Sequence, residues 1–394
     1  RGPSDRPAPP PAAPLPPAER VGFAIVGLGR LSLEEILPAF GECRKAKPVA
    51  LMSGSPDKAK AVAAQYGIKP EAVHGYDGWD ALARNPEVKA VYIVTPNALH
   101  RDQVIAAAGA GKHVLCEKPM AVSSGEARAM IEACAAAKVK LMIAYRCQYE
   151  PYNREVVRLV RSAKYGKVRL IEATNTQTMS LPEQWRLKKA LAGGGALPDI
   201  GLYCLNGVRA LMGEEPVAVQ AQVHSPDDAL YREVEETVAF TLRFPSGALA
   251  LCSTSYGAHE TRSLKVQAEG GAIDLQNAFA YQGQRLFVGH REGKAEARDE
   301  RVLGAKNQFA LEIDHMATCI LENRTPRTPG EEGLQDQILM EAIYEAARTG
   351  QTVALKGPER RPSLTDKEKA RDQARDQDAK GLDPTRGPEP EEAD

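Results

Sequence analysis

The sequence lacks the features that mark membrane proteins and nucleic-acid binders. No apolar run approaches the roughly 18 residues that a membrane span requires. Neither charge sign dominates, because 51 Lys and Arg residues stand against 52 Asp and Glu residues, so no global basic field draws the chain to nucleic acid or anionic lipid. With 43% apolar residues among 394, the chain can still bury sizeable cores. These observations predict a soluble protein with no nucleic-acid and no membrane partner.

Paired cysteines are also missing. The seven cysteines, at positions 43, 116, 134, 147, 204, 252 and 319, form no C-x-x-C pair and have mostly apolar neighbours. This is typical of reduced core thiols, so we expect neither a disulfide framework nor a metal site. The absence of disulfides favours the cytosol, although a chain with a large core does not need them in any compartment. Because the chain starts at Arg1 and not at Met, we expect a processed product without its targeting segment, which leaves the compartment open.

The two ends of the chain differ in composition from the rest. Eight of the first seventeen residues are proline, which predicts an extended, polyproline-like arm over residues 1–20, or else a disordered linker. Residues 357–394 are dense in charged residues, Pro and Gln, and have almost nothing to bury, so we expect a disordered tail or a frayed helix.

Between the two ends, the apolar pattern predicts two domains. In residues 21–147, apolar runs of strand length alternate with helical patterns, which indicates a parallel α/β Rossmann domain. Its expected strands are 21–26, 49–53, 90–95, 113–116 and 141–144, and its expected helices are 33–43, 56–66, 100–110 and 123–138. Residues 148–356 change to longer alternating strands, which predicts an α+β domain with a large, mostly antiparallel open sheet. The clearest strands there are 217–223, 237–244, 248–255, 264–269 and 285–288, followed by helices 308–322 and 331–348.

A glycine-rich turn follows the first expected strand. It reads Gly27-Leu28-Gly29-Arg30-Leu31-Ser32 and runs straight into a helical pattern. Glycines at such a turn let the backbone approach a pyrophosphate, although Ser32 stands where the third glycine of the dinucleotide fingerprint would be. The strand before, the helix after and a second strand about 20 residues further on favour dinucleotide binding over an ordinary tight turn.

The end of the second strand indicates which dinucleotide is bound. An NAD enzyme places Asp or Glu there, whereas this chain reads Ser53-Gly54-Ser55-Pro56-Asp57-Lys58. The small residues and Lys58, with Arg30 from the glycine turn, suit a 2′-phosphate and so favour NADP. Lys58 could equally be a solvated cation of the helix.

Three residues are candidates for catalysis. Lys118 follows an expected parallel strand, at the edge where open α/β sheets bind ligands, and would otherwise be a surface lysine. Asp199 and Tyr203 lie four apart and share one face of a helix, and would otherwise be an N-cap and a core tyrosine. A lysine close to a tyrosine lowers the pKa of the phenol, which favours its use as a general base.

Taken together, the motifs resemble those of the Gfo/Idh/MocA oxidoreductases. The resemblance spans about Val21 to Lys356 and is closest to the branch that contains glucose-fructose and aldose-aldose oxidoreductases. It rests on Gly27-x-Gly29, Ser53-Gly54, Thr95-Pro96-Asn97-x-Leu99-His100, Glu117-Lys118-Pro119, Ala144-Tyr145-Arg146-Cys147, Gln184-Trp185-Arg186-Leu187 and Asp199-Ile200-Gly201-x-Tyr203.

The resemblance implies roles for individual residues. Tyr203 is implied as the acid/base on the sugar hydroxyl, Lys118 as a contact of substrate and nicotinamide, and Asp199 as the residue that positions the sugar. The implied substrate contacts are Lys118, Arg146, Tyr149, Asp199 and Tyr203. The implied cofactor contacts are Gly27, Leu28, Gly29, Arg30, Leu31, Ser53, Gly54, Lys58, Tyr76, Thr95, Pro96, Asn97, Leu99, His100, Glu117, Lys118, Arg146, Trp185 and Arg186.

The resemblance also implies an activity. An aldopyranose is oxidised at C1 to a lactone, and the NADPH, which stays bound, is re-oxidised by a second sugar to give an alditol. Two alternatives are an NADP-dependent aldose or diol dehydrogenase that exchanges free cofactor, and a regulator that binds NADP or sugar without catalysis. Members of this branch are exported folded, so we expect a periplasmic protein, with the cytoplasm as the alternative. An open sheet face predicts a homodimer or homotetramer.

Overall fold

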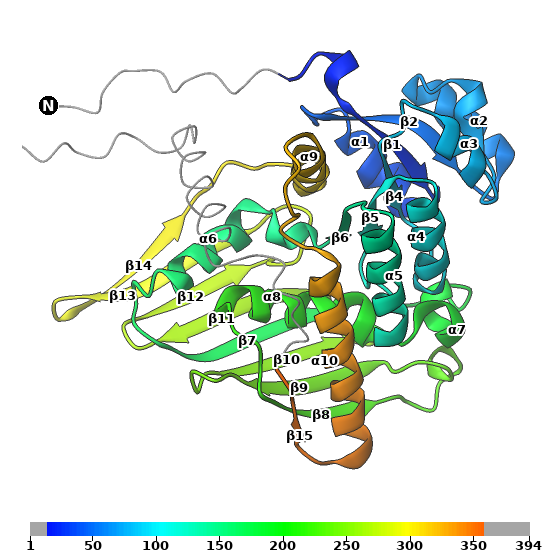
Figure 1. The fold of residues 1–394 in the computed structure, drawn as a ribbon. Coiled ribbons are helices and arrows are strands. Elements are labelled where there is room, and N and C mark those ends of the chain that lie inside the picture. The colour runs from blue at the N-terminus through cyan, green and yellow to red at the C-terminus, as the bar shows by residue number, and fades with distance from the viewer. Residues whose placement is uncertain (1–13, 358–394) are drawn as a thin grey trace, which may run out of the picture.

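Two β-sheets organise residues 14–357, the part of the chain that the computed structural model describes (Figure 1). Most of the expected proline-rich arm and nearly all of the charged tail lie outside the described residues. Within the described part of the arm, Pro17–Glu19 forms one turn of 3₁₀ helix, and the Leu15 amide donates to the Arg44 carbonyl at 2.9 Å. The arm is therefore joined to the first domain just before its first strand.

The first sheet is parallel, as the sequence predicts, and it has six strands, one more than the five that were expected. Its order is β3-β2-β1-β4-β5-β6, and every residue of the central strands β1 and β4 is buried. Burial on both faces explains why these strands are continuous apolar runs without alternation. The strands are β1 (Val21–Val26), β2 (Ala46–Met52), β3 (Val73–His74), β4 (Ala90–Ile93), β5 (His113–Glu117) and β6 (Leu141–Ala144). The helices between them are α1 (Leu37–Ala39), α2 (Pro56–Tyr66), α3 (Trp79–Arg84), α4 (His100–Gly109) and α5 (Ser124–Ala136).

The second sheet has nine strands in the order β14-β13-β12-β11-β7-β10-β9-β8-β15. All its neighbours pair antiparallel except β7 and β10, which pair parallel. The strands are β7 (Val168–Thr176), β8 (Ala218–His224), β9 (Thr237–Arg243), β10 (Leu249–Ser255), β11 (Thr261–Ala268), β12 (Gly271–Gln276), β13 (Arg285–Glu292), β14 (Ala295–Arg301) and β15 (Val353–Ala354). Buried and exposed residues alternate along β9 and β10, so one face of this sheet is covered and the other is open.

Helices cover one face of the second sheet and reach the first domain. Figure 1 shows α6 (Pro151–Arg161), α8 (Leu202–Met212) and α10 (Gly330–Thr349) on the same side of the sheet. The α10 helix contacts β8 at one end and α5 at the other, and α9 (Gln308–Leu321) packs on β1, β2 and β5. Although α9 comes late in the chain, it therefore belongs to the wall of the dinucleotide-binding domain.

The structure differs from the sequence predictions in a few elements. The helix expected over 33–43 is a π turn, Ser32–Ile36, followed by the short α1, because Pro38 has no N–H to continue the ladder. The strands that were not predicted are β3, β7, β12, β14 and β15. A hairpin turn at Pro245-Ser246-Gly247 joins β9 to β10, with Gly247 at φ +88°.

A buried carboxylate fixes the loop that leads into α8. Glu235 accepts the backbone N–H groups of Gly195 at 2.8 Å and Leu197 at 3.0 Å, and the Tyr344 hydroxyl at 2.9 Å. A Cβ atom on Gly195 would lie 2.0 Å from the Glu235 carbonyl oxygen, so only glycine fits there. Glu235 thus fixes the backbone just before the segment that carries Asp199 and Tyr203.

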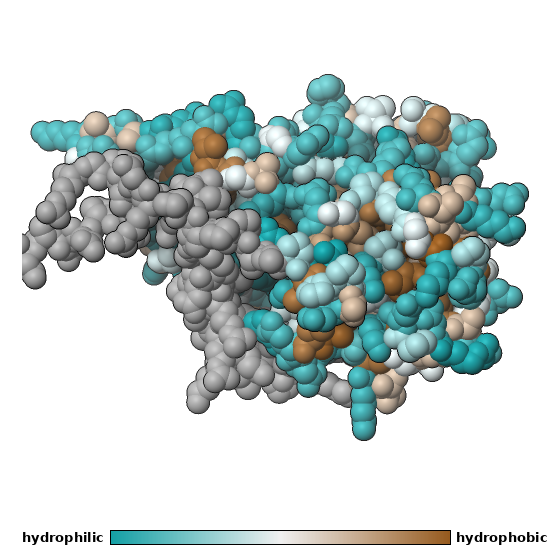
Figure 2. Space-filling view, turned by 90° about the horizontal axis from the view of Figure 1, so that it is seen from above, coloured by the Kyte–Doolittle hydropathy of each residue, from teal (hydrophilic) through white to brown (hydrophobic). Residues whose placement is uncertain are grey.

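The molecular surface is mixed in character. On the face seen in Figure 2, hydrophilic residues predominate and apolar residues lie scattered among them. Among residues 14–357, no helix combines the length and apolar character that crossing a membrane requires.

Candidate active site

The three candidate catalytic residues meet where the two domains touch. Lys118 lies just beyond β5, Asp199 lies in the π turn Leu197–Gly201, and Tyr203 lies in the first turn of α8. The Lys118 ammonium donates to the Asp199 backbone carbonyl at 2.6 Å and lies 3.4 Å from Asp199 Oδ1. It also lies 4.5 Å from the centre of the Tyr203 ring. The structure therefore brings these residues together across the domain boundary.

Asp199 is the acceptor at the centre of this cluster. Its Oδ2 atom accepts the Tyr256 hydroxyl at 2.7 Å and lies 3.1 Å from Arg186 Nε. Burial raises the pKa of Asp199, but Arg186, Lys118 and the Tyr256 hydroxyl outweigh burial and hold that pKa at about 2. Asp199 is thus ionised at any working pH and accepts hydrogen bonds only.

The pKa of Tyr203 departs from the sequence expectation. Desolvation by the surrounding protein raises the pKa of the phenol, and the nearby Arg146 guanidinium lowers it by less than that. The expectation that Lys118 would leave Tyr203 with a lowered pKa is therefore wrong for the protein without ligands. A sequence shows which cation lies near a phenol but not how deeply the phenol is surrounded.

Arg146 fixes the Tyr203 hydroxyl. Its Nε donates to Tyr203 Oη at 3.1 Å, and the guanidinium lies 4.6 Å from the centre of the same ring. The remaining guanidinium N–H groups donate to the Phe279 carbonyl at 2.7 Å and to the Gln308 side chain. Arg146 is only 5% exposed, so these partners replace the water that it loses.

The glycine-rich turn fits a dinucleotide. Gly27 has φ +100°, and a Cβ there would lie 2.7 Å from the Val94 carbonyl oxygen. Nothing lies within 4 Å of a Cβ on Gly29, which leaves its backbone open to a phosphate. Ser32 Oγ donates to the Gly27 carbonyl at 2.6 Å and so closes the turn at the position where the fingerprint has its third glycine.

The residues expected around the 2′ position of the ribose gather at the end of β2. Ser53 Oγ accepts the Ser55 amide at 3.1 Å, which leaves its own hydroxyl proton available. A Cβ atom placed on Gly54 would lie 3.4 Å from the Tyr76 ring, so the ring lies close to the Gly54 backbone. Lys58 is exposed, yet its ammonium reaches the Leu28 carbonyl at 3.3 Å, so it lies against the glycine turn. Arg30 instead points to solvent and pairs with Glu34 at 2.7 Å.

The Thr95–His100 segment connects the loops that surround the site. His100 is fully buried, and its ring nitrogens lie 2.9 Å from the Thr95 carbonyl and 3.0 Å from the Pro119 carbonyl. Asn97 Nδ2 donates to the Ala192 carbonyl at 2.9 Å. The imidazole therefore ties together the loops that follow β4 and β5, and Asn97 ties one of these loops to the second domain.

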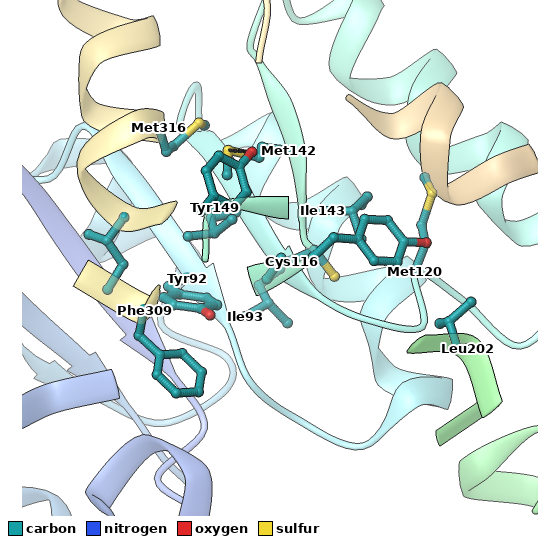
Figure 3. Packing of buried hydrophobic residues seen from close by; sticks show 14 of the residues in the cluster. Tyr92, Ile93, Cys116, Met120, Met142, Ile143, Tyr149, Leu202, Phe309 and Met316 are labelled. Carbon is teal, nitrogen blue, oxygen red and sulfur yellow. Dashed lines mark hydrogen bonds between the residues drawn. The ribbon is translucent and has the colours of Figure 1, made fainter. Parts of the chain in front are cut away.

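Tyr149 is the expected substrate contact that the structure does not bring into the cluster. Its hydroxyl lies 2.9 Å from Thr328 Oγ1 inside the core, and its ring packs on His315 at 5.1 Å. Figure 3 shows it beside Met142. Trp185, by contrast, lies at the site, where its ring stacks on the Arg186 guanidinium at 4.6 Å.

Several residues at the site were not predicted from the sequence. Tyr281 lies 4.5 Å over the Arg146 guanidinium and packs edge-on against Phe309 at 5.2 Å. Gln308 and Tyr256 hold Arg146 and Asp199, as described above. None of these lies in a motif with the residue that it contacts. The one local signal is that Tyr256 comes directly after an expected strand.

The thiols and acids add no metal centre to this site. Within residues 14–357, no group of three His, Cys, Asp or Glu side chains is placed to hold a metal ion. Six of the seven cysteines are buried, which confirms the predicted core thiols.

Known proteins share both domains of this chain. Residues 21–145 match the family described as "Oxidoreductase family, NAD-binding Rossmann fold", and residues 153–274 match the "GFO/IDH/MocA C-terminal domain". An aldose-aldose oxidoreductase from Caulobacter crescentus is 44% identical in sequence, and the match covers 85% of this chain and 100% of that one with a TM-score of 0.82. The NADP-dependent D-xylose 1-dehydrogenase of Haloarcula marismortui is 34% identical over 85% of this chain and 93% of its own length. A levoglucosan dehydrogenase, 23% identical with a TM-score of 0.76, shares the fold.

These matches cover both domains and the motifs around Lys118, Asp199 and Tyr203. The chain belongs to the Gfo/Idh/MocA family and is an NAD(P)-dependent oxidoreductase that acts on sugars.

Proposed function

We propose that the chain oxidises an aldopyranose at C1 to a lactone with NADP, and that a second sugar then re-oxidises the bound NADPH and leaves as an alditol. The observation that carries this proposal is the Lys118–Asp199–Tyr203 cluster at the carboxyl edge of the parallel sheet, which is where such folds bind ligands. The similarity to an aldose-aldose oxidoreductase supports the pairing of two sugars.

The residues divide the work according to their chemistry. Lys118 donates and Asp199 accepts, so together they orient neighbouring hydroxyls of a pyranose. Tyr203 Oη exchanges the proton of the C1 hydroxyl, and the adjacent cations Lys118 and Arg146 stabilise the phenolate that this exchange requires. The bound nicotinamide supplies hydride acceptance and donation.

Replacement of Tyr203 tests the proton-transfer role. Tyr203→Phe should lower kcat by about 10²–10⁴-fold, because a positioned acid or base contributes that much. The variant should stay folded with cofactor bound, because the ring keeps its packing contact with the Arg146 guanidinium, although the hydrogen bond from Arg146 Nε to the hydroxyl is lost. Steady-state kinetics with D-glucose and cofactor titration measure both effects. Near-normal turnover would remove Tyr203 from this role.

Cofactor choice rests on the end of β2, where no acid is available for a ribose 2′-hydroxyl. Ser53→Asp should shift preference from NADP toward NAD, because a carboxylate repels the 2′-phosphate in this partly desolvated position. Dissociation constants for both dinucleotides give the preference, and Ser53→Asn provides a control of the same size without charge. An unchanged NADP preference in Ser53→Asp would mean that the phosphate is recognised by other residues.

Retention of the cofactor distinguishes this proposal from an ordinary dehydrogenase, which the similarity to xylose dehydrogenases would equally support. Protein as purified should develop the absorbance of reduced nicotinamide when D-glucose is added without free cofactor. Addition of a second aldose or fructose should then remove that absorbance. If the signal depends on added NADP, the chain exchanges its cofactor at each turnover. The predicted periplasmic location rests on the resemblance alone, and fractionation of the source cells would check it.

The open face of the second sheet supports a homodimer or homotetramer. Leu249 and Leu251 of β10 are 39% and 44% exposed there, which is typical of a face that packs on another protein surface. Sedimentation velocity at micromolar concentration should therefore show a dimer or larger species. Leu251→Arg should shift the distribution toward the monomer, and a wild type that sediments as a monomer would contradict the expectation.

A further inference from the structure

Two buried carboxyl groups share one tyrosine hydroxyl directly behind Lys118. The hydroxyl oxygen of Tyr92, a residue of β4, lies 2.8 Å from Glu117 Oε1 at the end of β5. The same oxygen lies 3.1 Å from Glu312 Oε1 of α9. Tyr92 and Glu312 have no exposed surface, and Glu117 is 8% exposed. Figure 3 shows the Tyr92 ring packed in the apolar core, close to Phe309 and Ile93.

Counting protons shows that the two carboxyl groups cannot be equivalent. The Tyr92 hydroxyl carries one hydrogen and can donate it to one carboxylate only. A second carboxylate would face the phenolic oxygen with no hydrogen between them, at a site where Tyr92 and Glu312 have no exposed surface. Two negative charges at this separation are costly in an apolar interior. One carboxyl group therefore keeps its proton and donates it to Tyr92 Oη.

The remaining contacts identify which carboxyl group is protonated. The second oxygen of Glu117 accepts the Lys118 backbone N–H at 3.1 Å. The second oxygen of Glu312 is buried and has no hydrogen-bond partner among the described residues. Glu117 thus has the environment of a carboxylate, and Glu312 that of a neutral acid.

The surrounding charges favour the same assignment. Burial raises the pKa of both groups, and Arg146 opposes the rise for both. For Glu312 the charge on Glu117 raises the pKa further, whereas for Glu117 the cation Lys118 lowers it. The titratable or charged groups that face Glu312 from the elements packed around it are Tyr92, Glu117, Arg146, Cys147 and Tyr149. Among them only Arg146 is a cation, and it already donates to Tyr203, Phe279 and Gln308.

We propose that Glu312 is a positioning residue of this oxidoreductase: as a neutral acid it holds Tyr92, Tyr92 holds the Glu117 carboxylate, and Glu117 fixes the Lys118 peptide. The two carboxyl groups behind Lys118 then carry a single negative charge between them. Loss of the Glu312 proton at high pH would add a second charge and leave the phenolic oxygen without a donor. The chain of contacts would then no longer hold Lys118 in register with Asp199 and Tyr203.

The position of Glu312 on α9 strengthens this assignment. Gln308, one helical turn before Glu312, accepts a hydrogen bond from Arg146 and donates to the Ala280 carbonyl at 3.0 Å. Residues four apart on a helix share a face. One face of α9 therefore supports both cations that flank the Tyr203 ring, Arg146 through Gln308 and Lys118 through Glu312.

The proton on Glu312 can be detected by its linkage to folding. The unfolded chain releases this proton near the ordinary glutamate pKa of about 4.3, whereas the folded protein keeps it. Unfolding therefore releases one proton, and the stability of the wild type falls as the pH rises above about 5. Glu312→Gln keeps a donor toward Tyr92 and has no proton to release. The unfolding constant of the wild type relative to that of Glu312→Gln should rise about tenfold per pH unit between pH 5 and 8.

A matched control is available at Glu235. This glutamate is also buried, but three donors face it, so Glu235→Gln places an amide against N–H and O–H groups. Thermal unfolding of the cofactor-saturated proteins should show that Glu235→Gln is less stable than the wild type. The stability of Glu235→Gln relative to the wild type should not rise with pH, whereas that of Glu312→Gln should. Equal pH profiles of the wild type and Glu312→Gln, or failure of Glu312→Gln to fold, would overturn the proposal.

A spectroscopic measurement does not depend on stability. The infrared difference spectrum, wild type minus Glu312→Gln, should contain the carbonyl stretch of a protonated carboxylic acid at pH 7. Its absence would overturn the assignment of the proton to Glu312. Both measurements need no sugar substrate, so they stand even if the proposed reaction fails.

The consequence for catalysis is tested separately, and this part rests on the proposed function. If Glu312 ionisation disturbs Lys118, Glu312→Gln should move the alkaline limb of the kcat/KM profile to higher pH with D-glucose as substrate. A limb that stays where it is in the wild type, together with a detected Glu312 proton, would leave the protonation in place and overturn the positioning role.

Discussion

The contact between the Lys118 ammonium and Asp199 is the interaction on which the site depends. Lys118 belongs to the dinucleotide-binding domain and Asp199 to the second domain, and the ammonium donates to the Asp199 backbone carbonyl at 2.6 Å. Other contacts position these two partners: Glu117 holds the Lys118 peptide, while Arg186 and Tyr256 hold the Asp199 carboxylate. In the proposed reaction the cofactor of the dinucleotide-binding domain must meet a sugar at this boundary, and a fixed contact between the two domains would hold both in position.

The second constraint is charge balance inside a poorly hydrated region. Buried charges persist only when they are paired and hydrogen-bonded. The cations Lys118, Arg146 and Arg186 face the Asp199 and Glu117 carboxylates and a set of carbonyl groups. Protonation of Glu312 would keep this balance from becoming more negative. The cluster is therefore best regarded as one electrostatic unit, in which a substitution at one member alters the protonation of the others.

The sequence predicted the parts of the molecule that depend on local pattern. Continuous apolar runs predicted the buried parallel strands, and alternation predicted much of the open sheet, because burial on two faces or on one leaves a distinct period. Lys118 was singled out by its position at a strand end, and Asp199 and Tyr203 by their spacing on one helix face. Glu312 and Gln308 could not be predicted, because they meet Tyr92 and Arg146 across 220 and 162 residues of chain. The expected direction of the Tyr203 pKa shift was wrong for a related reason. Desolvation depends on all the elements that surround the phenol, and the local spacing of residues does not reveal them.

The direction of the hydrogen bond at Tyr203 limits how the phenol can act. Its oxygen accepts from Arg146 Nε, and a guanidinium has no lone pair with which to accept in return. The phenolic hydrogen must therefore point away from Arg146. In the proposed reaction the neutral phenol would protonate the acceptor sugar. To take a proton from a donor sugar it must first ionise, which burial opposes and the permanent charge of Arg146 favours. An arginine at position 146 keeps that charge at every pH at which the enzyme works, which a lysine in the same buried position would not.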